Sequence, residues 1–317
     1  MDSTPWFVGG GAQHSPEVAR AVAYAATGGA EGIVEPGGLK VAPLAVPGTS
    51  VRVIAGSAIL RNRYPGGGEQ SYIVRAPVQE TLAVTATGSS GGRSDLVVAR
   101  VLDPQYEGSA PADPVAFEYA RLAIIQGVPA STTRAADLSL GYPAIELARI
   151  DLPASTGTVT AAMIKDLRRL AQPRSSRVLR MGTPAAEAQL TAAGGQVWTS
   201  YRPTIEIPDW ATHMSMLVHL TSIWHQGASV MGNLLLTVGT GGSRWATLDE
   251  PYHFDDTTGG GERAGLTLGV EGALPSALRG TPQVLGIEGS RTAGTGFLKT
   301  IRGTRVIYDV TFSERAS

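Results

Sequence analysis

Apolar and polar residues alternate along most of the chain in short runs, and glycine or proline separates one run from the next. Such runs, rich in valine, isoleucine, leucine and threonine, predict β-strands. In the first half we expect strands at residues 32–34, 39–41, 50–60, 71–74, 81–87, 95–102, 117–125 and 145–151. In the second half we expect them at residues 197–207, 213–225, 234–238, 265–270, 283–287 and 296–312.

Two segments instead show helical patterns. Ser15-Pro16-Glu17 is a helix start, with a serine cap, a proline in the first turn and an early carboxylate. We expect this helix to end near Thr27, before a pair of glycines. The segment TVTAAMIKDLRRLAQP predicts a second helix, capped by Thr158 or Thr160 and stopped by Pro173.

The predicted fold is mainly β, in two domains. Residues 1–173 form a β-rich module with the two short helices, and residues 174–184 form a polar, proline-punctuated linker. Residues 185–317, roughly 130 in number, fit one antiparallel β-sandwich of the jelly-roll kind.

Composition narrows the function. The 317 residues carry a formal net charge of -1 and include no cysteine, which excludes disulfides and thiolate metal sites. Basic residues form no stripe, so we expect no nucleic-acid partner. No apolar run reaches the ~18 residues that a membrane span requires, so we expect no membrane insertion. We also expect no cofactor and no metal.

One serine matches a catalytic pattern. Gly88-Ser89-Ser90-Gly91-Gly92 fits G-x-S-x-G, the nucleophile elbow of serine hydrolases, in which a helix follows the serine. Here the residues after Ser90 are apolar and β-branched, so we expect a hairpin turn between two strands and no catalytic role.

Three histidines, His213, His219 and His225, recur at intervals of six. Even spacing places them on one face of a strand, but six residues of strand span ~20 Å, too far for a shared metal ion. We therefore expect the three histidines to be polar residues on the surface of a sheet.

The polar segment LDEPYHFDDTTGGGER, residues 248–263, is the best candidate for ligand contact. Its carboxylates could bind calcium or, beside aromatic rings, the hydroxyls of a sugar; an exposed loop without a ligand is the alternative. The candidate contact residues for such a sugar are Trp245, Asp249, Glu250, Tyr252, Phe254, Asp255 and Asp256.

Three ordered motifs resemble the N-terminal module of minor tail and upper-baseplate proteins of long-tailed bacteriophages that infect actinobacteria. They are RSDLVV at Arg93–Val98, LARIDLP at Leu147–Pro153, and Thr158–Arg168, with Val159 where isoleucine is common. The resemblance covers roughly residues 1–173, and the second half is similar only in style to the β-sandwich heads of such proteins. It implies a non-enzymatic structural protein of the virion tail tip or baseplate, made in the host cytoplasm.

The charged motif residues then have structural roles. We expect Asp95 to pair with Arg93 or to cap a turn, and Asp166 and Arg168 to make a docking contact with the linker or another subunit. We expect a homotrimer bound to other tail proteins, with apolar strand faces such as that of Met214 and Met216 buried between copies. The alternative is a glycan-cleaving tail enzyme with its carboxylates in the C-terminal domain.

Overall fold

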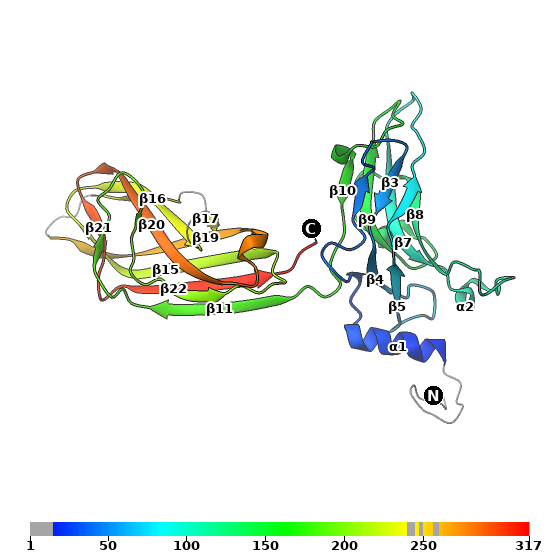
Figure 1. The fold of residues 1–317 in the computed structure, drawn as a ribbon, viewed down its shortest axis with the longest axis horizontal. Helices are drawn as coiled ribbons and strands as arrows, with labels where there is room; N and C mark the ends of the chain where they lie inside the picture. Colours follow the sequence, from blue (N-terminus) through cyan, green and yellow to red (C-terminus); the bar gives the residue numbers. More distant parts are fainter. Residues whose placement is uncertain (1–14, 240–244, 247–249, 256–259, 317) are drawn as a thin grey trace. The chain divides into compact units, whose positions relative to one another are not determined.

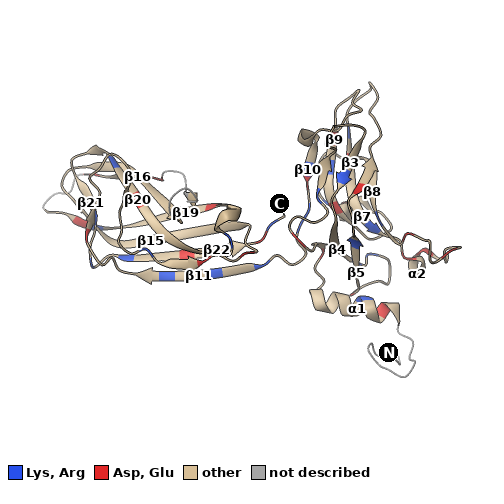
Figure 2. Ribbon diagram, in the orientation of Figure 1, with Lys and Arg blue, Asp and Glu red and all other residues tan. Residues whose placement is uncertain are grey.

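A computed structural model describes residues 15–239, 245–246, 250–255 and 260–316. Strands dominate, so the mainly β prediction is confirmed (Figure 1). The chain forms two compact units: one runs up to Gln172 and also takes in the residues from Arg315, and the other is Pro173–Glu314. Acidic and basic residues are interspersed over the strands of both units (Figure 2).

The first unit contains three antiparallel sheets. One has the order β1-β4-β5, a second β2-β3-β6, and the third β10-β9-β7-β8. The strands are β1 (Gly32–Ile33), β2 (Val41–Pro43), β3 (Ser50–Val53), β4 (Gly56–Arg61), β5 (Ser71–Ala76), β6 (Glu80–Ala83), β7 (Arg93–Val101), β8 (Ala120–Val128), β9 (Ala144–Leu152) and β10 (Ile164–Asp166). The predicted strand at 50–60 is thus two strands in two different sheets.

Strand β7 is the centre of the first unit. The first unit has two apolar clusters, one on each face of β7. Val97 and Ala99 pack into the larger of these two, together with residues of β3, β4 and β9. Leu96 and Val98 pack into the smaller one on the opposite face. The prediction that this strand is buried on both faces is confirmed, because β-strand side chains alternate between two covered faces.

Helix α1 (Pro16–Thr27) has the predicted start and stop: the Ser15 hydroxyl accepts a hydrogen bond from the Glu17 N–H, and Gly28 caps it in the left-handed conformation. The other helical segments of this unit are α2 (Pro104–Glu107) and the 3₁₀ turns η1 (Ala135–Leu138) and η2 (Ala161–Met163).

The predicted second helix is wrong. Residues 161–163 form the short turn η2, and Ile164–Asp166 form β10, which pairs antiparallel with Ala148–Ile150 of β9. The helical pattern loses here because the backbone of β9 needs hydrogen-bond partners along its open side, and a tertiary pairing of this kind overrides local propensity.

The second unit is a β-sandwich. One sheet has the order β11-β22-β15-β21-β12, with β19 also paired to β15, and the facing strands are built around β20 and β16. The bounds are β11 (Ser175–Gly182), β12 (Ala188–Gln189), β13 (Gln196–Val197), β14 (Thr204–Glu206), β15 (His213–Gln226), β16 (Val230–Val238), β17 (Trp245–Ala246), β18 (Glu250–Phe254), β19 (Glu262–Ala273), η4 (Ser276–Leu278), β20 (Pro282–Gly294), β21 (Phe297–Thr300) and β22 (Arg305–Ser313).

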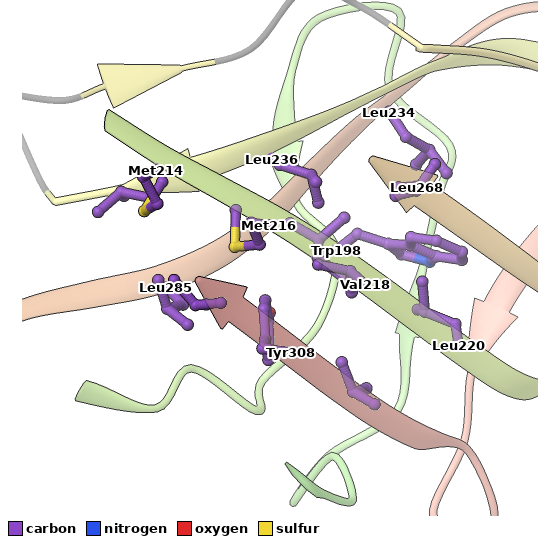
Figure 3. Packing of buried hydrophobic residues seen from close by; sticks show 14 of the residues in the cluster. Trp198, Met214, Met216, Val218, Leu220, Leu234, Leu236, Leu268, Leu285 and Tyr308 are labelled. Atoms are coloured by element: carbon purple, nitrogen blue, oxygen red, sulfur yellow. The ribbon is translucent and has the colours of Figure 1, made fainter. Parts of the chain in front are cut away.

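One continuous apolar cluster fills this sandwich. Figure 3 shows Met214, Met216 and Val218 in this cluster with Trp198 and Tyr308. Met214 and Met216 are at most 1% exposed, so the expectation that their strand face is buried between copies is wrong. The facing sheet of the same chain already covers that face.

The predicted linker at 174–184 is also wrong. Residues Ser175–Gly182 form β11, which pairs with β22 over eight consecutive positions. Its polar composition reflects an edge position, where one strand face and one backbone edge lie in solvent.

Candidate functional site

The predicted glycan-contact segment is largely a strand. Tyr252 of β18 is buried, its hydroxyl donates to the Ser290 carbonyl at 3.0 Å, and burial raises its pKa to about 12. Phe254 is half-buried against the core, with its ring 5.4 Å from that of His225. Tyr252 therefore cannot serve as a surface contact, because strand alternation turns it inward.

The other candidates in this region differ in accessibility. Glu250 and Asp255 are exposed, and an Asp255 carboxylate oxygen lies 3.6 Å from Nε2 of His253. Trp245 of β17 packs against the core of the sandwich. Asp249 and Asp256 lie outside the described residues. Among the described residues of the predicted contact set, Glu250 and Asp255 are thus the accessible acceptors.

The Ser90 turn lies between two strands, as expected, but it is not a hairpin. β6 pairs with β3, whereas the next strand, β7, pairs with β8 and β9 in a different sheet. The backbone of the turn bonds instead to residues after β9: the N–H of Ser155 donates to the Gly88 carbonyl at 2.9 Å. Because strand β7 follows where an elbow needs a helix, Ser90 lacks the geometry of a nucleophile.

The three histidines do not share one face of β15. The pairing of β15 with β19 shifts register between Leu220 and Ile223, and this irregularity turns the following side chains over. His219 lies on the outer face, with Nδ1 3.0 Å from the Thr267 hydroxyl, whereas His225 is fully buried. Among the described residues, no three histidine or carboxylate side chains are grouped closely enough to hold a metal ion.

The charged residues of the three resembling motifs form three Arg–Asp pairs in the first unit. The pairs are Arg93–Asp95, Arg149–Asp151 and Arg168–Asp166. Both members of each pair are two residues apart along extended backbone, so they project from the same face and meet side by side. Each contact is bidentate, with nitrogen–oxygen distances of 2.6–3.1 Å.

Each arginine also donates to the backbone carbonyl of a separate loop. Arg93 donates to Thr85, Arg149 to Thr132, and the fully buried Arg168 to Pro36 and Gly38 at 3.0 and 2.8 Å. The pairs therefore hold loops against the four-stranded sheet. The spacing of Arg149 and Asp151 was visible in the sequence. Only the folded sheet shows that all three pairs hold a loop against it.

Two of the pairs, Arg149–Asp151 and Arg168–Asp166, lower the pKa of their carboxylates. Hydrogen bonds from Arg149 hold the pKa of Asp151 well below its ordinary value, with further bonds from the Ser94 hydroxyl and Lys165. Burial alone would raise the pKa of Asp166, but hydrogen bonds from Arg168 outweigh it and lower that pKa. Carboxylates held in this way stay ionised and are poor proton acceptors.

The predicted ion pair of Arg93 and Asp95 is confirmed, and the Asp95 carboxylate also accepts from the Gly127 N–H at 3.0 Å. The predicted docking role of Asp166 and Arg168 is wrong for Arg168. Its side chain is 0% exposed and bonds within the first unit, because Asp166 ends the strand β10 and Arg168 follows it, where a surface helix was predicted.

The outer face of the large sheet in the second unit carries exposed apolar side chains. Leu179, Met181 and Leu217 are 49%, 61% and 47% exposed. Strand register places Leu179 and Leu217 on either side of Asp309, and Met181 beside Ile307. We call these residues, Leu179, Met181, Leu217 and Ile307, the outer apolar patch; such patches mark interaction surfaces when contiguous.

Comparisons with known proteins give no family. The sequence matches no protein family and no curated protein. Structures of infectious bursal disease virus are similar over 91% of this chain: the Gx strain at 14% identity, 76% of that chain and a TM-score of 0.24, and the VP2 subviral particle at 14%, 73% and 0.25. The insecticidal δ-endotoxin Cry8Ea1 of Bacillus thuringiensis aligns at 8% identity, 91% of this chain, 53% of that chain and a TM-score of 0.20. TM-scores this low do not establish a shared fold.

In the part of the chain that the structure describes, no helix is both long enough and apolar enough to cross a membrane.

Proposed function

We propose that this chain is a structural protein of a bacteriophage virion, located in the tail tip or baseplate. The proposal rests on one observation, the structural role of the charged residues in the three motifs. In all three motifs that resemble phage tail modules, the arginine and aspartate bind each other and fix loops to one sheet. The motifs thus specify a rigid scaffold, as an assembly module requires.

The proposed role is non-enzymatic. The residues that sequence patterns single out for chemistry have structural surroundings: Ser90 sits in a turn that leads into a strand, and His225 is buried in the sandwich. In this proposal the first unit anchors the protein to the tail, and the sandwich, Pro173–Glu314, faces outward.

Three copies assemble in this proposal around the tail axis through the outer apolar patch. Leu217 lies at one side of this patch, across Asp309 from Leu179, on the strand β15 that also carries the core of the sandwich. Cyclic symmetry lets identical patches cover one another. The patch replaces the core face of β15 as the surface for copy-to-copy contact.

Electron microscopy of phage particles labelled with an antibody to this chain tests the location. Label at the tail tip or baseplate is the expected result. Label on the head, or absence of the chain from purified particles, contradicts the proposal.

Light scattering of the purified protein tests the assembly. For the wild type we expect a trimer or a multiple of one. We expect the Leu217→Asp variant to dissociate into monomers, because a charge buried at the interface without a partner is costly. Val115→Asp, a change at a 96% exposed residue of the first unit, is the matched control and should keep the trimer. A stable wild-type monomer at micromolar concentration contradicts the trimer.

Attachment to a host glycan is a further part of the proposal, with Glu250 and Asp255 as contact residues. Each contact contributes only ~1 kcal/mol, so attachment depends on several copies acting together. The double variant Glu250→Ala, Asp255→Ala should adsorb less to host cells while particles still assemble. Unchanged adsorption would mean that these residues do not contact a glycan and that the sandwich is a scaffold. Release of oligosaccharides from host cell walls by the wild-type protein would instead favour a glycan-cleaving enzyme.

A further inference from the structure

A charged cleft lies in the first unit beside η1, where residues far apart in the sequence meet. Its cavity is about 210 Å³, and its charged lining residues are Glu31, Arg63, Arg134, Glu146 and Arg169. We call it the arginine cleft. A second cavity of about 180 Å³ shares Arg63 and Ala136 with it, so the two adjoin.

The walls of the arginine cleft are fixed by backbone contacts. The N–H of Ile33 donates to the Arg169 carbonyl at 2.8 Å, and the N–H of Ala171 donates back to the Ile33 carbonyl at 2.9 Å. Gly32, at φ 141°, permits this approach, since a Cβ there would lie 2.2 Å from the Arg169 oxygen. The backbone of Arg169 is therefore held at one wall of the cleft by main-chain hydrogen bonds alone.

Another part of the cleft wall is held against the strand β9. The N–H of Ala135, the first residue of η1, donates to the Glu146 carboxylate of β9 at 3.0 Å. This bond fixes the position of the preceding residue, Arg134, at the edge of the cleft. Both arginines thus stand on backbone that is already ordered, which reduces the entropy lost when a ligand binds.

The two carboxylates of the cleft already have partners. Glu31 accepts from the guanidinium of Arg63, and Glu146 accepts from Ala135. Their side chains are only 21% and 14% exposed. Burial raises the pKa of Glu31, as does the nearby charge of Glu146, while Arg63 opposes the rise. The two carboxylates are therefore mostly withdrawn from solvent, whereas the side chains of Arg63 and Arg169 are 40% and 48% exposed.

The arginines are not all satisfied. Arg169 Nε lies 4.0 Å from the Glu146 carboxylate, beyond hydrogen-bond distance, and its side chain is 48% exposed. The side chain of Arg134 has no hydrogen bond or ion pair with any residue in the described ranges. The lining residues thus include three arginines and two glutamates, which gives the cleft a formal net charge of +1.

We propose that the arginine cleft binds a small oxyanion, a carboxylate or phosphate group, through Arg134 and Arg169. The planar guanidinium fork matches both groups in geometry. The cavity is smaller than the roughly 300–1,000 Å³ pockets of drug-sized ligands, so the ligand is one small group, such as the acidic end of a single sugar or inorganic phosphate. This site is independent of the proposed virion role.

Isothermal titration calorimetry of the full chain tests the site with inorganic phosphate, glucuronate and uncharged glucose, all at one ionic strength. We expect heat of binding for at least one of the two anions and none for glucose. Binding of phosphate alone assigns an inorganic anion, and binding of glucuronate alone assigns an acidic sugar. Binding of neither anion overturns the proposal.

The variant Arg134→Gln should bind the same anion roughly tenfold more weakly, the loss expected for a charge-assisted hydrogen bond. Arg121→Gln is the matched control, because it removes the same charge from an exposed residue of β8 outside the cleft. Its binding should equal that of the wild type. Equal weakening in both variants shows a general charge effect and overturns the site, and unchanged thermal unfolding of Arg134→Gln confirms that the variant is folded.

Discussion

The two units are stabilised in different ways. In the first unit the buried charged residues are Asp95, Arg149 and Arg168, and each belongs to a pair that ties a loop to the four-stranded sheet. In the second unit one apolar cluster fills the space between two sheets, and most buried polar residues are threonines. Small sheets with long connections need specific polar contacts, whereas a sandwich of long strands is held mainly by burial of apolar area.

The largest effect should come from the core of the sandwich. Trp198 is fully buried and lies in the apolar cluster with Tyr308 (Figure 3). We expect Trp198→Ala to lower the free energy of unfolding by about 3–5 kcal/mol through lost burial and a cavity. Hydrogen exchange, followed separately in β15 and in β7, should show the loss in β15.

Trp198→Phe is the matched control for this change. It should cost less, because the ring keeps most of its apolar contacts and the indole N–H has no hydrogen-bond partner among the described atoms. If amides in both units lost protection from hydrogen exchange equally, the two units would not be stabilised independently in the way described.

Removing a pair in the first unit should rank second. Arg168→Met keeps the aliphatic length but leaves the Pro36 and Gly38 carbonyls without their donor. We expect a loss of about 3 kcal/mol, measured by denaturant unfolding, with early exchange of amides near residue 38.

The control for Arg168→Met is Arg177→Met, which removes a bidentate pair with Asp309 on the exposed surface of the second unit. Surface pairs contribute little, so this variant should unfold like the wild type. If the two variants lose equal stability, burial is not what gives the Arg–Asp pairs their strength.

The third effect is the response of the Arg149–Asp151 pair in the first unit to acid. The pKa of Asp151 is lowered in the folded state, so its stabilising effect is full above the unfolded carboxyl pKa of ~3.9 and is lost as pH falls towards the folded value. Asp151→Asn should be less stable than the wild type near neutral pH and should lose less stability on acidification. Unfolding curves recorded between neutral pH and roughly pH 2 check this. A parallel pH dependence for both proteins would exclude Asp151 as a source of acid sensitivity.

The smallest expected effect is at Ser90. Ser90→Ala changes one exposed hydroxyl in a turn between sheets, so stability, assembly and any measurable activity should stay unchanged. Loss of a hydrolase activity in a folded Ser90→Ala variant would instead assign this turn to catalysis.

Local sequence determined the elements whose signals are short-range. The serine cap and first-turn proline of α1, the apolar run of β7 and the i, i+2 spacing of Arg93 and Asp95 each act through neighbours along the chain. All three appear in the structure as predicted. Alternation also predicted the long strand β15, although the irregularity that buries His225 has no signal in its pattern.

Tertiary structure decided where local signals were weak or conflicting. Residues 158–172 have a helical pattern, and 174–184 have the composition of a linker, yet both contribute strands because β9 and β22 leave backbone groups that need partners. Tyr252 became a core residue for the same reason, once β18 paired with β16. The arginine cleft joins Glu31 to Glu146 across more than a hundred residues, a meeting that depends on the packing of sheets and not on any spacing along the chain.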